Sequence, residues 1–146
     1  KQVHRALSNA PRVLITKPLP YTDLVRLLSV STLALSDSGG IQEEAPSFGV
    51  PVLVLREVTE RIEAITSGCA MLVGTNRRRI FETASWLLTD AEARRAMTAA
   101  GNPFGDGRAA ERAEQAISWL LNLRQRPPDQ LINASSLPRP AALGRT

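Results

Sequence analysis

The sequence predicts an α/β fold in which helices flank a parallel β-sheet. Three observations predict this class. Short aliphatic runs alternate along the chain with segments of helical periodicity, which is typical of a parallel sheet with crossover helices. These runs lack polar alternation, as expected of strands covered on both faces. The 146 residues suit one domain, and a hydrophobic content of 43% with 4% aromatic residues predicts an aliphatic core.

The first elements follow from local patterns. RVLIT (12–16) is an apolar run before two prolines, and we expect it to form a buried strand. YTDLVRLLSVS then places leucines at helical spacing and predicts a helix with Thr22 as its cap. TLALS (32–36) predicts the second strand, which ends at two glycines.

The middle of the chain repeats the alternation twice. IQEEAPSF predicts a short helix that stops at Gly49, and PVLVL (51–55) predicts a third, fully covered strand. TERIEAITSG predicts a polar turn and a short helix that ends at Gly68. AMLVG (70–74) predicts the fourth strand.

The last third is predicted to be helical. RRRIFETASWLLTD and AEARRAMTAA predict two helices, the second capped by Asp90. GNPFGDG predicts an irregular loop, and RAAERAEQAISWLLNLRQ a long amphipathic helix. Residues 127–146 hold turn-forming residues without periodicity, so we expect a disordered tail after a folded domain over 1–126.

Composition argues against several classes of protein. The net charge of +4 is scattered and without interleaved aromatic residues, which argues against nucleic-acid binding. The single cysteine, Cys69, excludes an internal disulfide and a Cys-based zinc site, and we expect it to be a buried, inert thiol and no metal to bind. No apolar run reaches membrane-spanning length. The start lacks Met and a signal region, so we expect a cytoplasmic piece of a longer protein.

The segment SDSGG (36–40) combines three features of an anion site. Gly39 and Gly40 have no Cβ, so the backbone can turn tightly and a ligand can come close. The helix that follows begins with free N–H groups and a partial positive charge. Ser38 adds a hydroxyl donor. In a parallel sheet this segment lies at the carboxyl end of a strand, where ligands bind, and phosphate is the usual occupant.

Two carboxylates follow the glycines, and each has two interpretations. Glu43 and Glu44 stabilise a helix by lying in its first turn, and they need do nothing more. A carboxylate one turn along the helix also accepts hydrogen bonds from vicinal hydroxyls, as acidic residues do for ribose. Phosphate at the glycines and sugar at a glutamate together suggest a nucleotide.

The motifs resemble a known family. DSGGIQEEAPSFGVPVLVLREVTERIEAITSGCAMLVGTN (37–76) resembles the bacterial non-hydrolysing UDP-N-acetylglucosamine 2-epimerases. NPFGDGRAAERAEQAI (102–117) resembles the closing loop and return helix of that family, and KPLPYTDLVRLL (17–28) the segment before its glycine turn. The resemblance covers residues 13–121.

The resemblance implies a GT-B-type fold of two Rossmann-like halves with the active site between them, of which this chain holds most of the carboxyl-terminal half. The domain is therefore expected to be incomplete. In the family this half binds UDP. On matching positions, residues 38–40 would bind the diphosphate and Glu44 the ribose hydroxyls. The segment around Tyr21 and Leu24 would flank the uracil, although plain packing is an equal alternative for Tyr21.

The arginines of the loop after the third predicted strand have two interpretations. It reads REVTERIE where the family shows RDTTERPE, so three positions depart from the pattern. Arg56 or Arg61 would either neutralise phosphate in the cleft or fix the loop by an internal ion pair. Gln42 and Glu43 match the family motif, but a structural cap is as good an interpretation as ligand contact.

The resemblance implies an isomerase that needs no cofactor and inverts C2 of UDP-N-acetylglucosamine to give UDP-N-acetylmannosamine, for cell-surface polysaccharide biosynthesis. UDP is eliminated to leave a glycal intermediate and then added back. The family's base carboxylates lie in the amino-terminal half, which these residues do not include. We therefore assign no catalytic residue and expect the isolated chain not to epimerise.

The partners implied by the resemblance are a UDP-sugar and the amino-terminal half of the same enzyme, with a homodimer for the full-length family. Two alternatives stay open. One is a non-catalytic nucleotide-sugar-binding remnant of the same fold. The other is the carboxyl-terminal domain of a glycosyltransferase, although QEEAPSFGVPVLVLREVTERIEA favours the epimerase.

Overall fold

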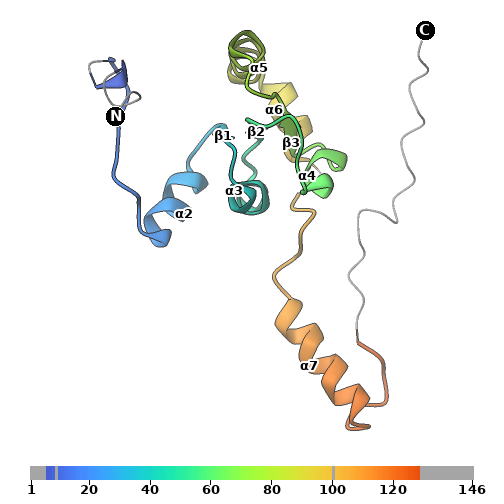
Figure 1. The fold of residues 1–146 in the computed structure, drawn as a ribbon. Coiled ribbons are helices and arrows are strands. Elements are labelled where there is room, and N and C mark those ends of the chain that lie inside the picture. Colours follow the sequence, from blue (N-terminus) through green and yellow to red (C-terminus); the bar gives the residue numbers. More distant parts are fainter. Residues whose placement is uncertain (1–5, 9, 100, 129–146) are drawn as a thin grey trace, which may run out of the picture.

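A three-stranded parallel sheet forms the centre of the molecule (Figure 1). The computed structural model describes residues 6–8, 10–99 and 101–128. The strands are β1 (Ala34–Ser36), β2 (Val52–Val54) and β3 (Ala70–Leu72), and they lie in the order β1-β2-β3. Both pairs are parallel. The predicted α/β class and parallel sheet are confirmed.

Helices surround the sheet on both faces, as the unbroken aliphatic strands predict. They are α2 (Tyr21–Ser29), α3 (Gly39–Glu44), the 3₁₀ helix η1 (Ala45–Phe48), α4 (Ile62–Thr66), α5 (Arg77–Thr89), α6 (Ala91–Thr98) and α7 (Ala109–Leu120). Gly49 ends η1 with a left-handed backbone (φ 67°), which confirms the predicted stop.

The central strand β2 divides the core into two halves. Its alternate side chains point to opposite faces, so Val52 and Val54 join one apolar cluster while Leu53 joins the other. The first cluster is completed from α2, η1 and α4, and the second from α5 and α6. All three β2 residues are fully buried. The members added by the helices are Leu28, Ala45 and Ala64 in the first cluster and Leu87 and Met97 in the second.

The strand predicted over residues 12–16 does not form. This segment has no strand assignment, and Leu14 is 87% exposed. An apolar run becomes a strand only where another strand offers free backbone groups, and Figure 1 shows this segment apart from β1. The prediction was wrong because strand formation depends on a partner that periodicity does not reveal.

Of the two predicted helix caps, one is confirmed and one is wrong. Asp90 caps α6, because its Oδ1 accepts a hydrogen bond from the Ala93 N–H at 3.0 Å, as predicted. That bond holds the pKa of Asp90 below its usual range. Thr22 is not a cap, because α2 begins one residue earlier and Pro20 occupies the cap position.

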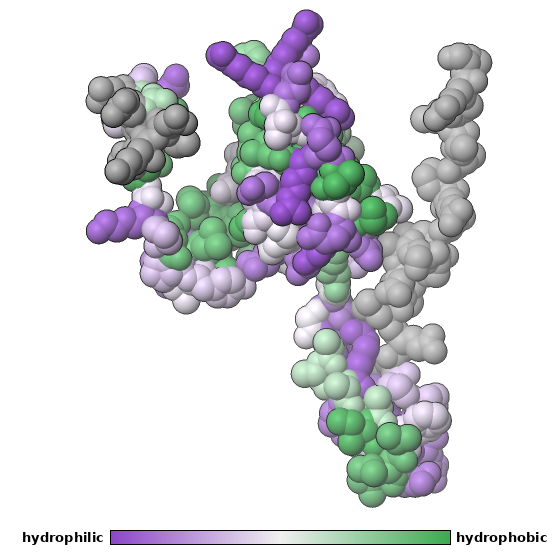
Figure 2. All heavy atoms as spheres, viewed as in Figure 1, coloured by the Kyte–Doolittle hydropathy of each residue, from purple (hydrophilic) through white to green (hydrophobic). Residues whose placement is uncertain are grey.

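Helix α7 stands apart from the sheet and is shorter than predicted (Figure 1). Its far end carries exposed apolar side chains, and a green group lies there at the foot of Figure 2; Ile117, Leu120 and Leu121 are exposed, as is Trp119. Most of the predicted tail lies outside the described residues. No helix among the described residues is long and apolar enough to cross a bilayer.

Candidate functional site

The turn between β1 and α3 presents polar groups to solvent. Ser38 occupies the cap position of α3 with an extended backbone, and its hydroxyl makes no capping hydrogen bond. The side chain of Ser36 instead holds the turn, because its Oγ accepts the Ser38 N–H at 3.0 Å. Ser38 and Gly40 are exposed. The Ser38 hydroxyl and the first helical N–H groups therefore stay accessible to a ligand.

Gly39 and Gly40 are needed for space and not for an unusual backbone. Both belong to α3, and neither is among the glycines with positive φ. A Cβ at Gly40 would lie 3.7 Å from Glu44 Oε1 and 3.8 Å from Ser38 Oγ, which is ordinary contact. Alanine at position 40 would therefore clash with nothing in the protein. What the missing side chains leave open is the approach to the backbone N–H groups from outside.

Glu44 lies one helical turn beyond Gly40, and its carboxylate sits beside the glycine turn. Its Oε2 is closed off from solvent and has no hydrogen-bond partner within the described part of the chain. A carboxylate oxygen left unpaired in this way costs about 1–3 kcal/mol. A turn of the Glu44 side chain toward solvent would give this oxygen partners, so the carboxylate is free to rearrange when a hydrogen-bond donor binds.

Arg61 lies against the start of α3. Its Nε donates to Glu43 Oε1 at 2.5 Å, and its Nη1 lies 3.1 Å from Glu60 Oε1. A Cβ at Gly39 would be only 3.2 Å from Arg61 Nη2. The guanidinium is therefore held at the glycine turn by ion pairs, which confirms the ion-pair interpretation of Arg61, while its contact with phosphate stays a prediction.

Arg56 forms an internal ion pair, and its contact with phosphate stays a prediction. Its Nη1 donates to Glu60 Oε2 at 3.3 Å. A hydrogen bond from its own backbone N–H, together with Arg56 and Arg61, holds the pKa of Glu60 below its usual range. The Glu60 side chain is 55% exposed, so water screens both ion pairs and they contribute little to stability.

A buried polar pair ties the 56–61 loop to α3. Gln42 is fully buried and Thr59 is 8% exposed. Thr59 Oγ1 donates to Gln42 Oε1 at 2.7 Å, and Gln42 Nε2 donates to the Ser38 carbonyl at 3.2 Å. Gln42 therefore has a structural role, while its partner Thr59 lies 17 residues away in sequence.

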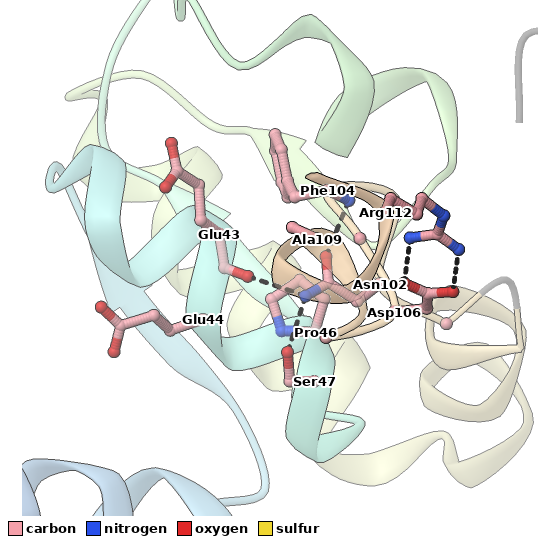
Figure 3. A pocket seen from close by; sticks show the side chains of 12 residues that line it. Glu43, Glu44, Pro46, Ser47, Asn102, Phe104, Asp106, Ala109 and Arg112 are labelled. Atoms are coloured by element: carbon pink, nitrogen blue, oxygen red, sulfur yellow. Dashed lines mark hydrogen bonds and ion pairs between the residues drawn. The ribbon is translucent and has the colours of Figure 1, made fainter. Parts of the chain in front are cut away.

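A cleft of about 790 Å³ lies at the other end of α3, between η1 and the loop before α7 (Figure 3). Asn102 forms one wall, since its Nδ2 donates to the Glu43 carbonyl at 3.2 Å and to Ser47 Oγ at 2.6 Å. Its Oδ1 accepts the Phe104 N–H at 2.9 Å. Phe104 packs against the first apolar cluster, so this loop is anchored to the sheet.

A bidentate ion pair also lines the cleft. Arg112 donates to both carboxylate oxygens of Asp106, at 2.8 and 2.6 Å (Figure 3). The guanidinium of Arg112 and the Arg108 backbone N–H hold the pKa of Asp106 well below its usual range. The pair fixes the first turn of α7 to the loop that precedes it.

The structure brings some predicted site residues together and leaves others apart. Ser38, Gly40 and Glu44 meet at the start of α3, with Arg61 beside them. Tyr21 is the first residue of α2 and is 64% exposed, so it does not pack in the core. Leu24 on the same helix packs against the first apolar cluster.

The sequence reasoning did not identify Thr59 and Asn102 as residues that hold α3. Both are polar residues in loops, and their partners on α3 are distant in sequence. The sequence held a usable indication for Asn102 only. An asparagine in a loop often accepts a hydrogen bond from the backbone N–H two residues later, as Asn102 does from Phe104.

Comparison with known proteins places these motifs in context. The family model described as UDP-N-acetylglucosamine 2-epimerase matches residues 1–118. The UDP-N-acetylglucosamine 2-epimerase of Escherichia coli K12 is 48% identical over 115 residues, which are 79% of this chain and 31% of that protein.

Two solved structures have the same fold. A Staphylococcus aureus MnaA–UDP complex superposes with a TM-score of 0.81 at 40% identity, over 88% of this chain and 35% of that one. The Neisseria meningitidis UDP-GlcNAc 2-epimerase bound to UDP-GlcNAc gives a TM-score of 0.74 at 41% identity, over 83% and 32% of the two chains. The chain spans about a third of the length of the curated relatives it matches.

Proposed function

Because the chain belongs to the UDP-N-acetylglucosamine 2-epimerase family, we propose that it is the UDP-binding portion of an enzyme that interconverts UDP-N-acetylglucosamine and UDP-N-acetylmannosamine. The observation that carries the proposal is the meeting of Ser38, Gly40 and Glu44 at the start of α3. Both solved structures described above are complexes, one with UDP and one with UDP-GlcNAc, which supports the same ligand here.

The diphosphate binds at the glycine turn. Its oxygens accept hydrogen bonds from the Ser38 hydroxyl and from the N–H groups of Gly39 and Gly40, which are free at the start of a helix. The partial charge of the helix end contributes about 0.3–1 kcal/mol, so the charge-assisted hydrogen bonds supply most of the affinity. Arg61 lies at the same place, paired with Glu43 and Glu60, so its guanidinium serves the diphosphate by turning from these carboxylates to the phosphate oxygens.

The ribose binds at Glu44. Vicinal hydroxyls donate to its carboxylate, and because Oε2 has no hydrogen-bond partner in the described part of the chain, the side chain can turn this oxygen toward the sugar without breaking a hydrogen bond. The distance of one helical turn between Gly40 and Glu44 suits a nucleotide whose sugar lies next to its phosphates. The uracil then lies toward the start of α2, beside Tyr21 and Leu24.

The same groups have a role in the reaction. Epimerisation by elimination breaks the bond between the sugar and the diphosphate, and negative charge develops on the departing UDP. N–H donors and a guanidinium aimed at that charge lower the barrier. The resemblance assigns the base that removes the proton at C2 to the amino-terminal half of the family, so for these 146 residues we propose binding without turnover.

The partner of this portion is the amino-terminal half of the enzyme, and a homodimer is the assembly proposed for the full-length protein. The match to the epimerase model favours an epimerase over a glycosyltransferase. A non-catalytic nucleotide-sugar-binding remnant remains the second candidate. Sequence encoded upstream of Lys1 distinguishes the two, because an epimerase requires an amino-terminal half that carries acidic residues.

Isothermal titration of the chain with UDP, CMP and ADP tests the proposal. We expect UDP to bind more tightly than either of the others, because the base lies at α2 and the diphosphate at α3. Equal affinity for UDP and ADP would mean that the site reads phosphate alone. No binding of any of the three would overturn the proposal. A steady-state assay with UDP-N-acetylglucosamine that shows turnover would overturn the assignment of binding alone.

A further inference from the structure

We propose that Thr59 is a positioning residue for the diphosphate end of the site and that it acts through Arg61. This inference rests on the proposed function. The hydrogen bonds of Thr59 go to Gln42 and to the Arg61 N–H, which are themselves the residues that reach the glycine turn. The Thr59 hydroxyl lies where the 56–61 loop meets α3, and the 8% exposure of Thr59 places it beneath the surface that the ligand would contact.

On one side, the Thr59 hydroxyl is fixed from α3. Its Oγ1 donates to Gln42 Oε1 at 2.7 Å, and Gln42 is fully buried. Gln42 Nε2 in turn donates to the Ser38 carbonyl at 3.2 Å. The buried amide therefore joins the hydroxyl to the residue that begins the glycine turn.

On the other side, the same hydroxyl fixes the 56–61 loop. Thr59 Oγ1 accepts the backbone N–H of Arg61 at 3.1 Å. This bond sets where the Arg61 side chain starts. The chain of contacts ends at Gly39, since a Cβ there would lie 3.2 Å from Arg61 Nη2.

The other contacts that hold Arg61 are ion pairs of its side chain, whereas the bond to Thr59 holds its backbone and is partly buried. Its guanidinium pairs with Glu43 and Glu60, whose side chains are 42% and 55% exposed. Exposed ion pairs contribute little and are screened by salt. Without the Thr59 hydroxyl, the Arg61 N–H and Gln42 Oε1 both lose their partner, and the loop can move away from α3 to reach water.

Thr59→Val tests the proposal, because valine has nearly the same shape and lacks the hydroxyl. The measured quantity is the ratio of UDP affinity to uridine affinity, by titration calorimetry on the full chain. Uridine lacks the diphosphate, so the ratio isolates that end of the ligand. We expect Thr59→Val to lower the ratio about tenfold, the usual effect of losing one hydrogen bond. Thr59→Ser, which keeps the hydroxyl, should restore the ratio, and the exposed Thr66→Val is the matched control.

The outcomes separate this inference from the proposed function. Wild-type protein without a preference for UDP over uridine overturns both. Wild-type protein with that preference, and Thr59→Val with the same ratio, overturns the inference alone. So does Thr59→Ser with a ratio as low as that of Thr59→Val.

A double variant supplies a measurement that loss of stability alone would not change. If Thr59 acts through Arg61, then Thr59→Val lowers the ratio no further in an Arg61→Gln background. A further tenfold loss there overturns the proposal. If Thr59→Val melts too low to titrate, the ratio of UDP affinity to uridine affinity is measured in Arg61→Gln alone. An unchanged ratio in that variant leaves Thr59 nothing to position and overturns the inference.

Discussion

Replacing Gly40 with alanine should stabilise the ligand-free chain and remove most of its affinity for UDP. Gly40 has a helical backbone, so alanine is the better residue there for folding. The gain is about 0.5–1 kcal/mol in a helix interior and smaller near a helix start. The new methyl group would lie 3.7 Å from Glu44 Oε1 and 3.8 Å from Ser38 Oγ, so it clashes with nothing.

The loss of affinity follows from the same methyl group. It projects into the space through which a phosphate oxygen reaches the helical N–H groups. One charge-assisted hydrogen bond is worth about 1.5–3 kcal/mol, which corresponds to a loss of about 10- to 150-fold in affinity. Thermal melting reports the stability, and isothermal titration with UDP reports the affinity.

Uridine is the control ligand for Gly40→Ala, because it has no diphosphate and its affinity should stay unchanged. A variant that melts higher and still binds UDP as tightly as the wild type would refute the diphosphate site. A variant that melts lower would refute the account of why glycine stands at this position. Loss of both ligands would indicate damage to the whole site.

Three further predictions test other parts of the account. Wild-type protein should bind UDP about tenfold more tightly than 2′-deoxyuridine diphosphate, because the deoxy ligand lacks one hydroxyl. In Glu44→Gln this preference should fall to a few-fold. The same preference in both proteins would show that Glu44 does not bind the ribose. The lowered pKa of Asp106 means that its pair with Arg112 stabilises the fold above about pH 4, the unfolded pKa, and that this contribution is lost as the pH falls through the lower folded pKa. Asp106→Asn should therefore melt lower than the wild type at pH 7, with a gap that narrows toward pH 2, and a gap independent of pH would contradict this. Burial raises the pKa of the Cys69 thiol, so a disulfide reagent at pH 8 should react slowly with native protein and quickly in denaturant, and equal rates would show that the thiol is accessible.

The parts of the fold that the sequence predicted correctly depend on local patterns. The strand at β2 is an unbroken aliphatic run, and its residues are buried on both faces as that pattern requires. The meeting of Gly40 and Glu44 was also predictable. Four residues on a helix make one turn, and that spacing brings the carboxylate back beside the glycine.

The parts that could not be predicted depend on partners distant in sequence. The run over 12–16 has the composition of a strand, but pairing needs a neighbouring strand, which the run itself does not specify. The bond between Thr59 and Gln42 crosses 17 residues, so no spacing rule indicates it. The misplaced cap of α2 has a local cause, because a helix can begin directly after Pro20 without a capping side chain.

The most direct test of the central claim is a titration of the ¹⁵N-labelled chain with UDP, followed through its backbone amide resonances. The claim is that the start of α3 binds the diphosphate of a uridine nucleotide. It predicts that the largest shifts occur at the amides of Ser38, Gly39, Gly40 and Glu44, and that uridine leaves the two glycines unshifted. Shifts confined to another surface, or no shifts at millimolar UDP, would contradict it.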